Sequence, residues 1–228
     1  MEIIPDSVMI GYVHMHTVFE AFSRSLAEVC LNKDSNIYGI IASQNPRQEA
    51  ARNATIQKFM DGFNDGHSHL GAEWFMWVDT DQTFEHDAIV RLRDTAHNYD
   101  ADAVGGLTFV YQRGAQEVHP NGWYWDGEHF VWIEDYEPGK VYEINGTGSA
   151  FVLINRKVFE AWDGDWHVTH VNHPATGEYM GHDLAFFHKM SVDDGFKLVW
   201  DTSVQSGHIK HFELTETQYH AYRSSLET

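Results

Sequence analysis

Basic residues are scarce in this sequence of 228 residues, where Lys and Arg total 15 against 34 Asp and Glu. The formal net charge is -19. Because such a surface repels a phosphate backbone over most of its area, the charge argues against a nucleic-acid partner. The same charge attracts cations.

Cysteine is almost absent, and the single Cys30 excludes an internal disulfide framework. This usage fits a reducing compartment. The first residues, MEIIPDSVMIGYV, carry no basic start, and no window approaches the roughly 18 apolar residues of a membrane span. We therefore expect a cytoplasmic protein without a membrane span.

Apolar residues make up 43% of the chain, which is enough to bury the core of one full-sized domain. In the first half, strand-like and helix-like segments alternate, which is typical of a parallel sheet covered on both faces. The expected strands are 7–13, 36–42, 73–78 and 103–111, and the expected helices are 18–31, 47–63 and 83–98.

The second half has a different pattern. Residues 119–136 are rich in aromatics around Asp126-Gly127, which predicts a hairpin. Further strands are expected over 148–155 and 197–200, with a helix over 182–194. Since no repeat or linker divides the chain, the sequence predicts an α/β fold with one domain and a mixed, mostly parallel sheet flanked by helices.

The segment EWFMWVDTDQTFE contains a buried strand that ends in two carboxylates, Asp79 and Asp81. Ligands bind at the carboxyl ends of strands in open parallel sheets, and hard divalent cations prefer oxygen ligands. The pair therefore suggests a metal site. The alternative is that Asp81 caps the following helix.

Two other Asp-x-Asp pairs, Asp100-Asp102 and Asp163-Asp165, do not follow a buried strand. The first precedes its strand, and the second surrounds a glycine in an expected turn. Both are best interpreted as solvated loops.

Four ordered segments together resemble the GT-A fold glycosyltransferases, especially the broad family 2 type. They are PRQEAARNATIQKF (46–59), VDTDQTFEHDAIVRL (78–92), GTGSAFVLINRKVFE (146–160) and GHDLAFFHKMSVDDGFKLVWDTSVQSGH (181–208). The resemblance covers roughly residues 7 to 208. It implies a nucleotide-sugar-binding half over about 1–110, an acceptor and catalytic half over about 111–208, and a C-terminal tail over 209–228.

The resemblance also implies a Mn²⁺ or Mg²⁺ held by Asp79, Asp81 and His208. Arg52 is then a ligand of the donor's diphosphate or base, with Asp79 on the same side; the alternative is a surface Arg52 paired with Glu49. His14 and Ser43 follow the first two strands, where such folds place nucleoside contacts. His14 and His16 together are weak grounds for zinc, because no third ligand is near.

The same resemblance assigns Asp183 as the base that deprotonates the acceptor. His182 stands where the first acid of an acidic pair is often found, and it is a candidate acceptor contact. A helix-capping role for Asp183 is the alternative. Sugar rings stack on aromatic side chains, so Trp123 and Trp125 are candidate acceptor contacts, as are Thr147 and Gly148; core packing and a tight turn are their alternatives.

The function expected from these residues is metal-dependent transfer of a sugar from a UDP- or GDP-sugar to a hydroxyl acceptor, with inversion at the anomeric carbon. Two alternatives stay open: a nucleotidyltransferase of related fold and a non-catalytic carbohydrate-binding protein. The first usually has a Gly-rich basic loop after the first strand, whereas HMHTVFEAF has none. The second does not need Asp79, Asp81, Asp183 and His208 together.

Overall fold

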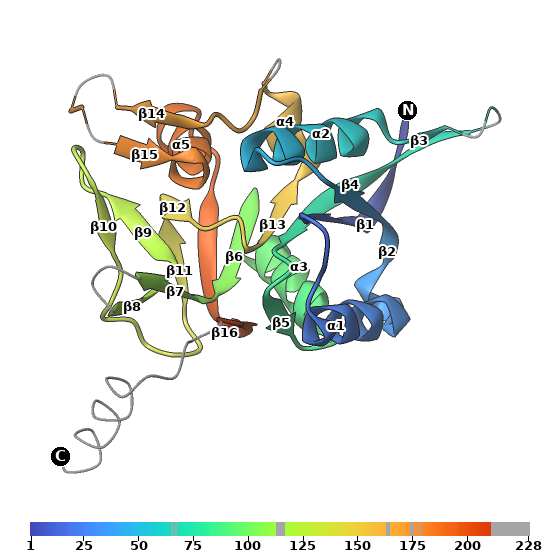
Figure 1. Ribbon diagram of the computed structural model, residues 1–228, viewed down its shortest axis with the longest axis horizontal. Coiled ribbons are helices and arrows are strands. Elements are labelled where there is room, and N and C mark those ends of the chain that lie inside the picture. Colours follow the sequence, from blue (N-terminus) through green and yellow to red (C-terminus); the bar gives the residue numbers. More distant parts are fainter. Residues whose placement is uncertain are drawn as a thin grey trace, which may run out of the picture.

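In the computed structural model of the protein, which describes residues 1–64, 66, 68–112, 117–162, 165–173, 176–177 and 179–210, a nine-stranded mixed sheet forms the centre (Figure 1). Its main path runs β11-β16-β6-β13-β4-β1-β2, with β3 beside β4 and β5 beside β16. In path order these strands are β11 (Val141–Ile144), β16 (Leu198–His208), β6 (Ala103–Leu107), β13 (Phe151–Asn155), β4 (His69–Val78), β1 (Glu2–Val13) and β2 (Ile37–Ser43), followed by β3 (Phe63–Asn64) and β5 (Gln82–Phe84).

Parallel pairing joins β1 to β2, β1 to β4 and β6 to β16. Strand β13 lies between β4 and β6 and runs antiparallel to both. The expected mixed α/β sheet is thus confirmed, and its parallel part is concentrated in the first half of the chain. The alternating strands and helices of that half account for this, because parallel neighbours need a crossover connection.

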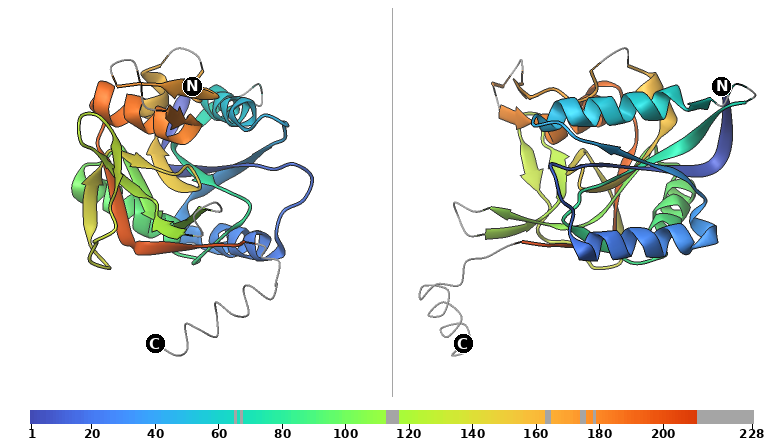
Figure 2. Two further views of the ribbon diagram at one scale, coloured as in Figure 1. Left: turned by 60° about the vertical axis from the view of Figure 1, so that its left-hand side comes forward. Right: turned by 45° about the vertical axis from the view of Figure 1, so that its right-hand side comes forward.

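Helices cover both faces of the sheet (Figures 1 and 2). One face carries α1 (Glu20–Leu31) and α3 (Ala88–Tyr99), and the other carries α2 (Gln48–Asp61), α4 (Arg156–Glu160) and α5 (His182–His188). The position of β4 between two helix layers explains why its sequence is apolar throughout. Phe75 and Trp77 belong to the core under α2, α4 and α5, whereas Trp74, Met76 and Val78 belong to the core under α1 and α3.

Short strands complete the second half of the fold. The hairpin expected around Asp126-Gly127 is present as β9 (Gly122–Trp125) and β10 (Phe130–Trp132), with β12 (Gly146–Thr147) on the other side of β9. Two further pairs are β7 (Phe109–Gln112) with β8 (Glu117–Pro120), and β14 (His170–Asn172) with β15 (Tyr179–Gly181).

Several expected elements have different bounds. Strand β1 begins at Glu2, α3 begins at Ala88, and the helix expected over 182–194 is α5 followed by a π-helix over Lys189–Asp193. The strand expected over 103–111 is divided between β6 and β7 at Thr108, whose backbone N–H donates to Asn121 Oδ1. The last strand extends to His208 rather than ending at Trp200, because its distal part pairs with β5. Of the expected tail over 209–228, residues beyond Lys210 lie outside the described residues.

None of the helices in the described ranges is long and apolar enough to span a membrane.

Candidate active site

The carboxyl end of β4 opens onto a pocket of about 420 Å³. Asp79 directly follows the strand, where its backbone N–H donates to the Ala150 carbonyl at 2.9 Å. Helix α3 begins only at Ala88, and its N-cap is Asp87. Asp81 is therefore not a helix cap and is left facing the pocket. The pocket is lined by Val13, His14, Met15, Phe19, Asn45, Pro46, Gln48, Ala51, Asp79, Thr80 and Asp81.

Arg52, on α2, is fully buried beside this pocket. Its Nη2 donates to Asp79 Oδ1 at 3.1 Å, and its Nη1 donates to the Ser149 carbonyl at 3.3 Å. The guanidinium carbon lies 4.8 Å from the centroid of the Trp77 ring, within the range of a cation–π contact. The alternative of a surface Arg paired with Glu49 is thus excluded, and the cation is positioned at the strand ends.

Asp183 lies in the first turn of α5, on the other side of the same guanidinium. Its Oδ1 is 4.0 Å from Arg52 Nε, accepts a hydrogen bond from Ser149 Oγ at 2.6 Å, and is 2.8 Å from His182 Nδ1. Burial raises the pKa of Asp183, but the charges of Arg52 and His182 more than offset this and hold the pKa well below its usual range. Asp183 is thus a carboxylate at neutral pH.

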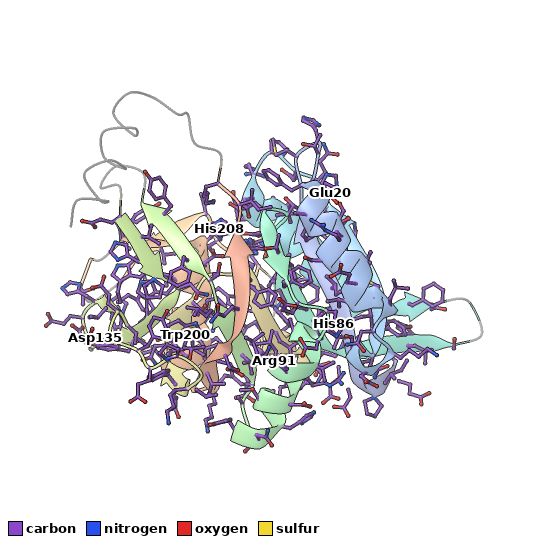
Figure 3. The ribbon with its side chains drawn as sticks, turned by 90° about the horizontal axis from the view of Figure 1, so that it is seen from below. Glu20, His86, Arg91, Asp135, Trp200 and His208 are labelled. Atoms are coloured by element: carbon purple, nitrogen blue, oxygen red, sulfur yellow. The ribbon has the colours of Figure 1, made fainter. Side chains whose placement is uncertain are left out.

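Asp81 and His208 meet at the end of β16. Figure 3 shows His208 at the end of this strand and Trp200 farther back along it. Asp81 Oδ2 lies 3.1 Å from His208 Nε2 and 3.2 Å from Lys210 Nζ. Burial raises the pKa of Asp81, but these two partners outweigh it and lower the pKa.

The Asp81–His208 pair fits a divalent cation. Two ligands at about 2.1 Å from an octahedral ion, at right angles to each other, lie about 3.0 Å apart. His208 Nδ1 is 2.6 Å from the Phe109 carbonyl, to which it must donate. In the neutral ring, Nε2 therefore carries the lone pair, which a metal would take in place of the contact with Asp81. Lys210 is the counter-ion of Asp81 that an ion would compete with.

Asp79 is turned differently from Asp81. Burial raises the pKa of Asp79, and Arg52 opposes that shift. Its Oδ1 faces Arg52 rather than the Asp81–His208 pair. Asp79 and Asp81 therefore line the same pocket with different neighbours. Asp79 pairs with the guanidinium of Arg52, and Asp81 pairs with the imidazole of His208.

The two nucleoside-contact predictions have different positions. His14 lines the pocket, and its backbone N–H donates to the Ser43 carbonyl at 3.1 Å. Ser43 is buried, accepts a hydrogen bond from Lys58 Nζ at 3.3 Å, and is not part of the pocket lining. Ser43 therefore supports the loop that carries His14.

The acceptor candidates also divide into two kinds. Trp123 is buried, with its ring centroid 4.3 Å from that of Trp132, and Thr147 Oγ1 is held by Asn121 Nδ2 at 3.0 Å. Both therefore pack inside the fold. Trp125 is only partly buried, and a Cβ at Gly148 would meet nothing nearer than Ala150 N at 4.0 Å, so both adjoin open space.

Several residues at the site were not singled out from the sequence. Ser149 links Arg52 to Asp183 and lies inside a quoted motif, so its place beside Gly148 was the available signal. Gln48 Oε1 accepts from His182 Nε2 at 3.3 Å, and Lys210 contacts Asp81. His167 lies next to His182 with a ring-centroid distance of 5.8 Å, and no motif surrounds it.

Neither a protein-family model nor a curated protein matches this sequence. Solved structures do match: the crystal structure of A197 from STIV has a TM-score of 0.58 at 16% identity, covering 90% of this chain and 86% of that one. GalNAc-T7, solved with UDP, GalNAc and Mn²⁺, has a TM-score of 0.58 at 14% identity. The match covers 91% of this chain but only 44% of the GalNAc-T7 chain.

These likenesses show the fold of the chain, which is GT-A-like. They do not single out the family 2 type.

Proposed function

We propose that the protein is a metal-dependent glycosyltransferase that moves a sugar from a UDP- or GDP-sugar to a hydroxyl acceptor. One observation carries this proposal: buried Arg52 joins Asp79, which ends the central strand and lines the pocket, to Asp183 in the first turn of α5. A purely structural ion pair would not need a third carboxylate, Asp81, facing the same pocket beside His208. The GT-A-like fold provides the architectural context.

In this proposal, Asp81 and His208 hold a Mn²⁺ or Mg²⁺, with Asp79 on the donor side of the site. The bound ion supplies Lewis-acid stabilisation of the negative charge that develops on the leaving diphosphate. Arg52 acts as a fixed positive charge that positions Asp79 and Asp183. His14 and Gln48 line the pocket, and in this proposal they contact the nucleotide sugar.

Asp183 is the proposed general base. Its low pKa makes it a weak base, but glycosyl transfer passes through an oxocarbenium-like transition state. As the new bond forms, the acceptor oxygen becomes strongly acidic, so a correctly placed carboxylate of low basicity can take its proton. Ser149 and Arg52 both approach Oδ1, which orients the carboxylate. A single displacement with this base inverts the anomeric configuration.

The direct test measures release of nucleoside diphosphate from a panel of UDP- and GDP-sugars with Mn²⁺. We expect one donor class to be turned over in a metal-dependent manner and Asp81→Asn to lower the rate at least about a hundredfold. Asp100→Asn is the matched control, because Asp100 caps α3 in the left-handed conformation, which Asn also adopts.

Three outcomes would contradict the proposal. Release of pyrophosphate instead of nucleoside diphosphate indicates a nucleotidyltransferase. Glycan binding without turnover of any donor indicates a carbohydrate-binding protein. Equal rate losses in Asp81→Asn and Asp100→Asn would show that the Asp81 position has no special role.

A further inference from the structure

His167, His182 and Asp183 form a cluster whose combined arrangement the transfer reaction does not require. One ligand atom from each residue lies within 4.8 Å of the other two. Within the described ranges, this is the one group of three metal-ligating side chains that meets this criterion. The Asp79, Asp81 and His208 set does not meet it.

His167 is a fully buried imidazole with unused ring nitrogens. Neither Nδ1 nor Nε2 has a hydrogen-bond partner among the residues that the structure describes. The neutral form of this ring carries a lone pair on one of its two nitrogens. Because a buried polar group without a partner costs about 1–3 kcal/mol, this ring requires a reason beyond packing.

The orientation of the His167 ring is fixed by its neighbours. The ring stacks on Phe186 at a centroid distance of 4.9 Å and an interplanar angle of 13°. On the backbone, Asn53 Nδ2 donates to the His167 carbonyl and Asn53 Oδ1 accepts from the His167 N–H, both at 2.7 Å. A ligand held in this way loses little conformational freedom on binding an ion.

His182 presents the second nitrogen. Its Nε2 donates to Gln48 Oε1, which leaves Nδ1 of the neutral ring without a proton. This Nδ1 lies 2.8 Å from Asp183 Oδ1, but it makes no hydrogen bond within the described part of the chain. In the neutral ring, Nδ1 and Asp183 Oδ1 are two electron-pair donors, and a cation bound between them would replace the proton that pairs them when the ring is charged.

We propose that His167, His182 and Asp183 bind a transition-metal ion of the Zn²⁺ or Co²⁺ class, at a site distinct from Asp81 and His208. Two imidazoles and one carboxylate are a common three-ligand set for such ions, with water in the fourth position. Tetrahedral ligands at about 2.1 Å from the ion lie about 3.4 Å apart. The His182–Asp183 pair at 2.8 Å must therefore open slightly, and any separation near the 4.8 Å limit must contract. Imidazole ligands favour these ions over Mg²⁺.

Access and charge are compatible with this ion. The side chains of His182 and Asp183 are partly exposed, which gives an entry route from solvent. Arg52 opposes a dication, but its charge is already compensated by Asp79 at 3.1 Å. The remaining carboxylate, Asp183, is therefore available as an anionic ligand.

Occupancy has a consequence that rests on the proposed function. An ion on Asp183 takes the electron pairs that the base needs, so metal binding here and proton removal from the acceptor exclude each other. Zn²⁺ should thus inhibit Mn²⁺-dependent transfer. Binding of the ion itself does not depend on whether the protein transfers sugars.

The test uses Co²⁺ added to the full chain after chelator treatment, because four-coordinate Co²⁺ absorbs visible light far more strongly than six-coordinate Co²⁺. Asp81→Asn removes the other cation site and should keep an intense band that saturates near one equivalent. His167→Gln and His182→Gln should each lose it. The control is His188→Gln, a buried histidine on α5 whose ring lies 4.7 Å from Trp125. It should keep the band.

The proposal is overturned if Asp81→Asn shows no intense band, or if His182→Gln keeps it. Because His167 is buried, circular dichroism checks that His167→Gln is folded; if it is not, the partly exposed His182 decides the result. A protein that gives this band but releases no nucleoside diphosphate with Mn²⁺ alone contradicts the transferase, not the Co²⁺ site. The reverse result contradicts only the Co²⁺ site.

Discussion

Replacement of Arg52 by Met tests the central ion-pair arrangement. Arg52 is fully buried and lies between Asp79 at 3.1 Å and Asp183 at 4.0 Å. Met has a similar length and can pack on Trp77, but it leaves two carboxylates without their cation. The change therefore isolates the charge of Arg52 from most of its volume.

The expected loss of stability follows from this geometry. Removal of one partner from a buried ion pair costs about 3–5 kcal/mol. Because the side chains of Asp79 and Asp183 keep 27% and 29% exposure, water relieves part of the cost, and about 3 kcal/mol is the better figure. For a chain of this length, that corresponds to a fall in Tm of about 6–12 °C. Adding Asp79→Asn to Arg52→Met should restore part of the loss.

The pH dependence has a definite sign. In the wild type the folded pKa of Asp183 is lowered, so its stabilising contribution is present above the unfolded pKa of about 3.9 and is lost as pH falls toward the folded pKa. Without Arg52, burial dominates and raises the pKa of both carboxylates. The Arg52→Met variant therefore loses stability at neutral pH, where both carboxylates are charged, and protonation of these carboxylates restores part of it. The stability difference should narrow between about pH 7 and about pH 4.

Urea denaturation followed by tryptophan fluorescence measures both effects, because the chain has 8 Trp residues. Lys is a second substitution that retains a cation but not the planar fork, and Arg52→Lys should lose less stability than Arg52→Met. The reasoning is refuted if Arg52→Met lies within about 1 kcal/mol of the wild type at neutral pH. It is also refuted if the difference grows as pH falls.

Three further variants address the proposed transfer chemistry. His208→Ala should weaken Mn²⁺ binding at least about tenfold in calorimetry, and excess Mn²⁺ should recover turnover; a folded variant that no Mn²⁺ concentration rescues would contradict a ligand role. Asp183→Asn should bind donor normally, melt within about 4 °C of the wild type, and transfer at least about a hundredfold more slowly. Wild-type turnover in Asp183→Asn would remove the base assignment, and a product of retained configuration by NMR would remove the single displacement. Lys210→Met should bind Mn²⁺ about twofold to fivefold more tightly, since it removes the competing cation on Asp81; unchanged or weaker binding would contradict that competition.

The sequence was informative where one local pattern determined the structure. The run Trp74 to Val78 predicted a central strand, and alternate side chains of β4 do enter the two cores. The pair Asp79 and Asp81 was predicted at the end of this strand, and both residues line the pocket. A strand covered on both faces must be apolar throughout, so this signal needed no tertiary information.

The sequence was less informative where a partner distant in the chain decides the outcome. Strand β16 continues to His208 because β5 pairs with it. The sequence between Trp200 and His208 has no pattern that predicts this pairing. Ser149 and His167 acquire their positions at the site through Arg52 and Asn53, both on α2. Hydrogen bonds of this kind depend on the packed arrangement of elements and have no periodic signature.

The position of β16 links the site to the order in which the sheet can form. This strand pairs in parallel with β6, with Ala103 opposite Leu198, and its far end brings His208 to Asp81. Such pairing requires closure of a very long loop, which is a slow event in folding. We therefore expect the Asp81–His208 contact to form late, after the first-half strands have associated. A bound ion would hold that late contact closed, so metal should slow unfolding more than it speeds folding.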